Sequence, residues 1–227
     1  LTLTVNASGK TVLTNIDDVT RTVGASGSTG DVTIAGVGSY SKGTSVTGGS
    51  GNDTINMGGN LNSLDTVVGG DGIDTLLVTG NANTLGMGAG VSGVEVFGGS
   101  TANADQTLRM DTVAEASSFY VVNADAADDS TAYTTTLSKS ENGDVINIYA
   151  GSSESDATND GTAVTVTAAV DSTTDDITFV LAGIGAAAKT SGNDAYAATS
   201  GIQTITASSH ETVNITSNAN ATNAAIT

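Results

Sequence analysis

Two glycine- and aspartate-rich stretches give the clearest indication of chemistry in this sequence. They read Gly-Gly-Ser-Gly-Asn-Asp-Thr-Ile-Asn at residues 48–56 and Gly-Gly-Asp-Gly-Ile-Asp-Thr-Leu-Leu at residues 69–77. Both fit the nonapeptide G-G-x-G-x-D-x-U-x, in which U is a large aliphatic residue. Glycine permits a tight turn whose main-chain carbonyl groups converge, and aspartate adds a hard carboxylate oxygen. Such an oxygen-only set of ligands suits Ca²⁺ better than Zn²⁺ or Mg²⁺.

We expect one Ca²⁺ site where these two turns stack on the same side of the fold. The candidate ligands are the residues of the two turns, Gly48, Gly49, Ser50, Gly51, Asp53, Gly69, Gly70, Asp71, Gly72 and Asp74. A degenerate copy of the repeat lies between them and predicts an intervening turn on the opposite side. Weaker metal candidates are Asn60 and Asp65 in that copy, and Asp144, which follows a glycine and precedes an aliphatic run.

Short runs of β-branched residues supply the elements that must hold these turns. The runs alternate apolar and polar residues and are bounded by Gly, Asn, Asp or Ser, which is typical of strands and turns. They lie at residues 1–5, 32–34, 94–96, 145–148, 164–166, 177–180 and 213–216. A solenoid needs only a narrow aliphatic column, supplied coil by coil. We therefore expect an all-β fold: a right-handed parallel β-helix or β-roll solenoid with short strands, long loops and Ca²⁺-binding turns near residues 48–77.

Composition and charge exclude several classes of protein. Of the 227 residues, 24 are acidic and 6 are basic, so that the formal net charge is −18, and there is no cysteine. Nucleic-acid binding is not expected, because no basic cluster is present. The absence of cysteine excludes disulfides and thiolate metal sites. No apolar run approaches the roughly 18 residues that a membrane-spanning helix requires, so we expect no membrane insertion.

Catalytic motifs are not evident, and we expect that the chain is not an enzyme. His210 is the only histidine and stands between Ser209 and Glu211. Adjacent residues of a strand point to opposite faces, so these neighbours cannot converge as a catalytic triad. Neither the H-E-x-x-H nor the G-x-S-x-G motif occurs. Acidic pairs such as Asp17–Asp18 and Asp175–Asp176 fit either further cation ligands or solvated loop residues.

The two nonapeptides resemble the RTX repeats of bacterial proteins exported by type I secretion. The phrases Gly-Val-Glu-Val-Phe at 93–97 and His-Glu-Thr-Val-Asn-Ile at 210–215, with the Thr/Ala/Val-rich stretch 162–181, extend the likeness. Together they resemble the body of the Caulobacter-type surface-layer (S-layer) family. This resemblance implies a secreted, Ca²⁺-dependent structural subunit that self-assembles on the bacterial cell surface. Only residues 48–77 carry specific motifs of the repeat.

Under this interpretation we expect the chain to be a fragment of a larger protein with three segments. Residues 1–47 would continue a solenoid from preceding sequence, residues 48–100 would form the RTX-like roll, and residues 101–227 would form an irregular β-solenoid. The expected cofactor is Ca²⁺, and the expected partner is another copy of the chain in a two-dimensional lattice. Cell-surface polysaccharide would be contacted through regions outside this chain.

Two other functions stay open at this point. The first is an RTX adhesin or a non-catalytic module of a secreted enzyme, which would use the same Ca²⁺ chemistry. The second, which we rank lower, is a β-helix enzyme that acts on polysaccharides. Enzymes of that kind use aromatic platforms for sugars, whereas this chain contains no Trp, three Phe and five Tyr.

Overall fold

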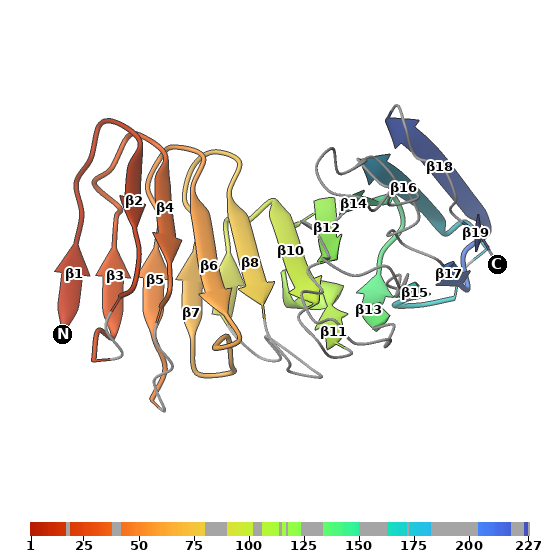
Figure 1. Ribbon diagram of the computed structural model, residues 1–227, viewed down its shortest axis with the longest axis horizontal. Helices are drawn as coiled ribbons and strands as arrows, with labels where there is room; N and C mark the ends of the chain where they lie inside the picture. Colours follow the sequence, from red (N-terminus) through yellow and green to blue (C-terminus); the bar gives the residue numbers. More distant parts are fainter. Residues whose placement is uncertain are drawn as a thin grey trace, which may run out of the picture. The chain divides into compact units, whose positions relative to one another are not determined.

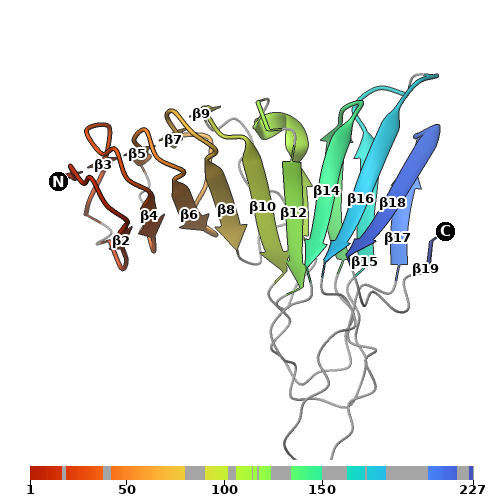
Figure 2. The same ribbon diagram turned by 90° about the horizontal axis from the view of Figure 1, so that it is seen from above.

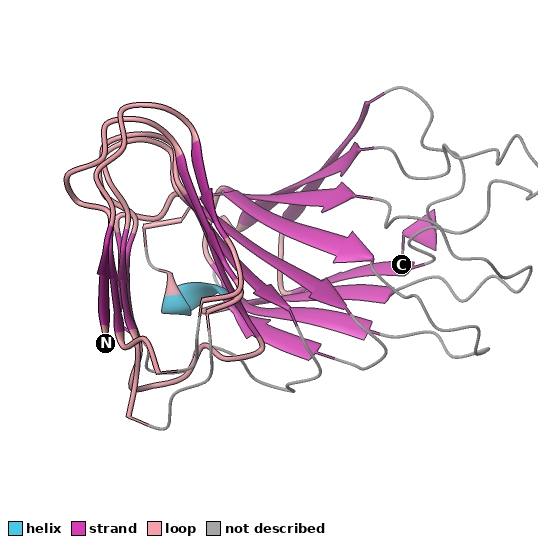
Figure 3. Cartoon of the chain, turned by 60° about the vertical axis from the view of Figure 1, so that its left-hand side comes forward, coloured by secondary structure: helices cyan, strands magenta, loops and turns pink. Residues whose placement is uncertain are grey.

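The computed structural model describes residues 1–16, 19–37, 42–79, 90–101, 106–113, 115–116, 118–123, 134–149, 163–171, 173–182, 204–218 and 225–226. These residues form β-strands and one short 3₁₀ helix, Met110–Thr112, with no α-helix among them (Figure 3). Every strand pair whose register is defined is parallel. The expectation of an all-β fold with parallel strands is therefore confirmed.

The chain divides into two compact units. Unit 1 contains Leu1–Gly80, Thr84–Gly99 and Arg109–Ser118. Unit 2 contains Asn81–Asn83, Ser100–Leu108 and Phe119–Thr227.

Unit 1 places successive strands alternately in two parallel sheets. The first sheet contains, in spatial order, β1 (Thr2–Thr4), β3 (Thr22–Gly24), β5 (Ser45–Thr47), β7 (Thr66–Val68) and β9 (Gly90–Ser92). The second contains β2 (Thr11–Leu13), β4 (Val32–Ala35), β6 (Thr54–Gly58) and β8 (Thr75–Thr79), followed by β10 (Val96–Thr101). Each coil thus adds one strand to each sheet, which is the arrangement of a β-solenoid (Figures 1 and 2).

Unit 2 repeats this alternation with longer strands. One sheet contains β11 (Gln106–Arg109), β13 (Thr134–Ser140), β15 (Ala163–Ala168), β17 (Thr204–Ser208) and β19 (Ala225–Ile226). The other contains β12 (Ser118–Asn123), β14 (Asp144–Tyr149), β16 (Asp176–Ala182) and β18 (Thr212–Asn218). The expected strand runs in this half of the chain fall within β14, β15, β16 and β18.

The core of unit 1 consists of aliphatic columns one residue wide. Ile34, Ile55 and Leu76 occupy the same register position in β4, β6 and β8, and none of them is more than 1% exposed. Val23, Val46 and Val67 form the facing column and are fully buried. Because alternate residues of a strand face opposite ways, the flanking Thr and Ser side chains point outward. A chain with few aromatic residues can therefore still build a continuous core.

Candidate metal centre

The two glycine-rich turns lie one above the other at the corners that precede β6 and β8. The Asp71 N–H donates to the carbonyl oxygen of Gly49 at 3.1 Å, and the Thr75 N–H donates to the carbonyl oxygen of Asp53 at 2.8 Å. The segment that contains Asn60 and Asp65 connects β6 to β7 at the other end of these strands. The structure therefore brings the 48–53 and 69–74 turns together and separates them from Asn60 and Asp65.

Asp53 is buried, and both of its carboxylate oxygens accept main-chain hydrogen bonds. The Val32 N–H, in the preceding coil, donates to Oδ1 at 2.7 Å. The Gly49 N–H, in the same turn, donates to Oδ2. These two bonds join the aspartate to its own turn and to the coil before it.

Asp74 holds the equivalent position in the next coil, but only one of its oxygens is engaged. The Asp53 N–H donates to Asp74 Oδ1 at 2.7 Å. The whole residue is only 1% exposed, and its Oδ2 is buried without a hydrogen-bond partner. A buried polar atom without a partner is uncommon in folded proteins and costs about 1–3 kcal/mol, or more when it carries charge.

The backbones of the two turns differ although their sequences follow one pattern. Gly70 and Gly72 both have φ = +126°, a conformation that favours glycine, whereas Gly49 and Gly51 do not adopt a positive φ. This difference accompanies the unequal surroundings of the two aspartates. In the first turn a glycine N–H reaches the second carboxylate oxygen, and in the second turn no donor does.

Two oxygen atoms pack closely against Gly69. A Cβ atom on Gly69 would collide with the carbonyl oxygen of Gly93 and would lie 2.5 Å from Asp74 Oδ2. The absence of a side chain therefore allows a carboxylate oxygen and a main-chain carbonyl oxygen of the next coil to approach the Gly69 backbone closely. Both are oxygen ligands of the kind that Ca²⁺ takes, so the residues present fit this ion.

Negative charge is concentrated around Asp74. Burial raises the pKa of Asp74 to about 6, the hydrogen bond from the Asp53 N–H opposes the rise, and the charges of Asp53, Glu95 and Asp71 add to it. Glu95 Oε2 in turn accepts the Asp74 N–H at 2.8 Å. A bound cation would favour the ionised carboxylate and offset the like-charge repulsion.

A regular ladder of acidic side chains runs along this corner of unit 1. Each acid accepts the N–H of the residue 21 positions earlier: Asp53 accepts from Val32, Asp74 from Asp53, and Glu95 from Asp74. Asp65 forms the same kind of bond with the Thr44 N–H. Carboxylates at these positions therefore join coil to coil. This role was not among the expectations from the sequence, and the spacing of 21 residues is the signal that points to it.

The weaker candidates are separated from the two glycine turns. The Asn60 side-chain amide donates to the carbonyl oxygen of Val37 at 2.8 Å. Asp65 is buried, its Oδ1 accepts the Thr44 N–H at 2.7 Å, and its Oδ2 accepts the Asn62 N–H and side-chain amide, each at 2.8 Å.

Asp144 belongs to unit 2 and is also buried. Its Oδ2 accepts the Glu141 N–H at 2.7 Å. Burial raises the pKa of Asp144 to about 6, with an opposing contribution from this hydrogen bond and a further rise from the Glu141 charge. Asp144 therefore caps its own turn.

The remaining expected ligands lie at the outside of the turns. Ser50 and Asp71 are exposed, and Ser50 Oγ donates to the carbonyl oxygen of Ser28 at 3.4 Å. No group of three or more His, Cys, Asp or Glu side chains with metal-binding geometry occurs within the described ranges. A cation at this corner would therefore depend largely on main-chain carbonyl groups. The Asp17–Asp18 pair lies outside the described residues.

His210 contacts a serine that the sequence analysis did not consider. Its Nε2 lies 2.9 Å from Oγ of Ser140, 70 residues earlier in the chain, and its Nδ1 is buried without a hydrogen-bond partner. Lys139 and Ser209, the residues immediately before this pair, have φ values of +68° and +62°. Ser140 is only 2% exposed, so this serine is not placed to meet a substrate. Nothing in the local sequence around His210 indicates this distant contact.

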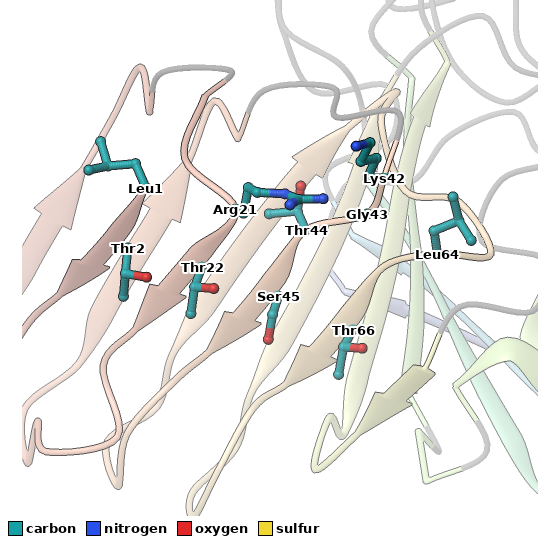
Figure 4. A pocket seen from close by; sticks show the side chains of 10 residues that line it. All are labelled: Leu1, Thr2, Arg21, Thr22, Lys42, Gly43, Thr44, Ser45, Leu64 and Thr66. Atoms are coloured by element: carbon teal, nitrogen blue, oxygen red, sulfur yellow. The ribbon is translucent and has the colours of Figure 1, made fainter.

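A shallow groove of about 430 Å³ lies on the first sheet of unit 1. The hydroxyl-bearing residues Thr2, Thr22, Ser45 and Thr66 follow one register column along it, with Arg21 and Lys42 beside them (Figure 4). The groove is thus lined chiefly by the outward Thr and Ser residues that the parallel register aligns.

Comparisons with known proteins do not identify this chain. No family model, no curated protein and no solved structure matches it. Over the part of the chain that the structure describes, no helix has the length and apolar character needed to cross a membrane.

Proposed function

We propose that this chain is a Ca²⁺-stabilised structural module of an extracellular, self-assembling bacterial surface layer. The observation that carries the proposal is the carboxylate ladder, in which buried Asp53, buried Asp74 and half-buried Glu95 occupy equivalent places in successive coils. Neighbouring coils are about 4.8 Å apart, so two ionised carboxylates at this spacing repel each other by about 3 kcal/mol at an effective dielectric constant of about 20. A divalent cation bound between the carboxylates would replace this repulsion with a net attraction.

The architecture supports a structural role. Each coil buries a narrow aliphatic column and joins the next coil through main-chain hydrogen bonds, as in quasi-one-dimensional repeat proteins. The two nonapeptides resemble RTX repeats of secreted bacterial proteins, which implies folding in a calcium-rich exterior. With a formal net charge of −18, copies of the chain repel one another unless cations bridge or neutralise them.

Ca²⁺ would supply the positive charge that this corner of unit 1 lacks. The residues that would hold it are Asp74, through its carboxylate, and glycines of the adjoining turns, through their carbonyl oxygens. The ladder hydrogen bonds would position those groups, because Asp53 and Glu95 connect the coils on either side of Asp74.

Electron microscopy of the purified chain tests this function. With millimolar Ca²⁺ we expect ordered sheets, and with a chelator we expect dispersed particles. Dispersed monomers under both conditions would contradict a lattice-forming role and favour an adhesin or a secreted module. Release of products in a screen of oligosaccharide substrates would contradict a purely structural role.

A further inference from the structure

We infer that the Ca²⁺ site lies between the 69–74 turn and the turn at Gly93, one coil beyond the position that the two nonapeptides indicate. This inference rests on the proposed function and deepens it. Asp74 is the carboxylate ligand and Gly93 supplies a main-chain carbonyl oxygen. Asp53, which the sequence pattern makes equivalent to Asp74, is instead a structural residue that joins two coils.

Both carboxylate oxygens of Asp53 accept hydrogen bonds from main-chain N–H groups. Its Oδ1 accepts the Val32 N–H at 2.7 Å and its Oδ2 accepts the Gly49 N–H. Each oxygen of Asp53 thus already accepts one N–H, so neither of them is left buried without a partner. Its carboxylate therefore lacks the unpartnered oxygen that Asp74 offers to an ion.

Only one carboxylate oxygen of Asp74 accepts a hydrogen bond. Its Oδ1 accepts the Asp53 N–H at 2.7 Å, while Oδ2 is the one carboxylate oxygen among the described residues that is buried with no partner. A cation at this atom would satisfy it without breaking any hydrogen bond. Asp74 is thus already oriented for binding by the same ladder that engages Asp53.

Two glycine positions allow a direct comparison between the neighbouring corners. Gly48 packs closely against the carbonyl oxygen of Gly69 and against Asp53 Oδ2, which accepts the Gly49 N–H. Gly69 packs closely against the carbonyl oxygen of Gly93 and against Asp74 Oδ2, which accepts no hydrogen bond. The second corner therefore gathers the same two types of oxygen, but its carboxylate oxygen has no donor.

The coil after Asp74 provides the other side of the site without a third nonapeptide. Gly93 has φ = +58°, and its N–H donates to a carboxylate oxygen of Glu115. Glu95 accepts the Asp74 N–H at 2.8 Å. Glu95 and Glu115 are therefore positioning residues, which hold the peptide groups of Asp74 and Gly93. The phrase Gly-Val-Glu-Val-Phe at 93–97 lacks the nonapeptide pattern, so motif searching alone does not find this half of the site.

Ca²⁺ titration of the 227-residue chain by calorimetry, with Tb³⁺ luminescence as a second probe, separates the two aspartates. Asp74→Asn should weaken Ca²⁺ binding by roughly 10–100-fold, the range in which altered metal sites lose affinity. Asp53→Asn should keep the affinity within about threefold and should instead lower the unfolding midpoint, because its ladder bonds weaken. Asp71→Asn is the matched control, since it removes the same charge from an exposed position of the same turn.

A further variant tests the close approach of the two oxygens at Gly69 without a change of charge. Gly69→Ala places a methyl group against the Gly93 carbonyl and Asp74 Oδ2 and should also reduce Ca²⁺ affinity, with circular dichroism to establish that the variant is folded. Loss of binding in Asp53→Asn with retention in Asp74→Asn would overturn this placement of the site while leaving Ca²⁺ dependence intact. An equal loss in Asp71→Asn would overturn it too, because affinity would then follow net charge alone. A wild-type chain that binds no Ca²⁺ would overturn the proposed function as well.

Discussion

Asp53 and Asp74 show how two residues at equivalent positions of a repeat can acquire different chemistry. Their sequence motifs coincide and their register differs by one coil, yet only Asp74 is left with an unpartnered carboxylate oxygen. The difference is accompanied by positive φ values at Gly70 and Gly72. At the residue scale the free energy of an unpaired buried charge therefore decides which repeat can hold a cation.

The effect of Asp74→Asn on the free energy of unfolding should change sign when Ca²⁺ is added. In a chelator we expect the variant to be more stable than the wild type by about 1–2 kcal/mol, because it removes a buried charge with an unsatisfied oxygen. The Gly93 carbonyl oxygen and Asp74 Oδ2 both lie beside Gly69, so an amide at this position has a nearby acceptor. In saturating Ca²⁺ the wild type should be the more stable protein. Urea unfolding under both conditions measures this, and a variant that is less stable in both would contradict it.

Asp144 predicts a pH dependence in unit 2 that needs no metal. Its pKa is raised by burial from 3.8 to about 6, so the folded state holds a proton that the unfolded state releases. Stability contributed by this group is therefore complete below about pH 4 and is lost as the pH rises toward 6, with an upper limit of about 3 kcal/mol.

The matched variants for this prediction are Asp144→Asn and Asp171→Asn. The first removes the titrating group but keeps an oxygen for the Glu141 N–H, so its stability should vary less between pH 4 and pH 6 than that of the wild type. The second removes an exposed acid from the same unit and should retain the wild-type pH profile. Thermal unfolding at a series of pH values measures both, and an unchanged profile in Asp144→Asn would rule out this assignment.

At the element scale the sequence identifies several strands from their alternating runs and misses others, which include most of the three-residue strands and the seven-residue β13. The runs at 32–34, 164–166 and 177–180 fall in β4, β15 and β16. By contrast, β3, β5, β7 and β9 are three residues long, and such short strands carry too little alternation to be read alone. Their conformation depends on stacking against neighbouring coils.

The candidate site shows the same limit. The nonapeptides indicate two turns that do stack, and the structure places them in successive coils. The φ values of Gly70 and Gly72, and the contribution of Gly93 from a coil with no motif, depend on backbone packing between coils. The contact between Ser140 and His210 could not be predicted from the sequence either, because it joins residues 70 positions apart.

The aliphatic columns should account for most of the stability of each coil. Ile55 is 1% exposed and packs in register between Ile34 and Leu76, so Ile55→Ala should cost about 2–5 kcal/mol. Ile73 precedes the next strand and is 60% exposed, so Ile73→Ala should change stability by less than about 0.5 kcal/mol. Chemical denaturation compares the two variants, and similar losses in both would argue against a core made of single-residue columns.

At the scale of the whole molecule, charge and coil stacking connect folding to the ionic environment. The formal charge of −18 favours dispersion of copies in the absence of divalent cations. Sodium chloride screens long-range repulsion but cannot bridge two carboxylates at close range. Assembly should therefore respond to millimolar Ca²⁺ and not to an equal ionic strength of NaCl, as measured by light scattering. Equal assembly in both salts would contradict Ca²⁺ bridging.

The two compact units should differ in their response to the metal. The inferred site lies in unit 1, so hydrogen exchange of peptides that cover residues 48–79 and 90–97 should slow when Ca²⁺ is added. Peptides that cover residues 134–149 and 163–171 in unit 2 serve as the internal reference and should change little. Uniform protection of both units would place Ca²⁺ elsewhere or at many sites.

Thermal unfolding of the wild-type chain with and without Ca²⁺ tests the central claim most directly. A ligand that binds only the folded state stabilises it by about 2.7 kcal/mol at 100 times its dissociation constant. We therefore predict a Tm that rises by several degrees with Ca²⁺, falls again when a chelator is added, and does not respond to Mg²⁺ in the same way. A Tm that is identical in Ca²⁺ and in chelator would show that this solenoid folds without calcium and would contradict the account.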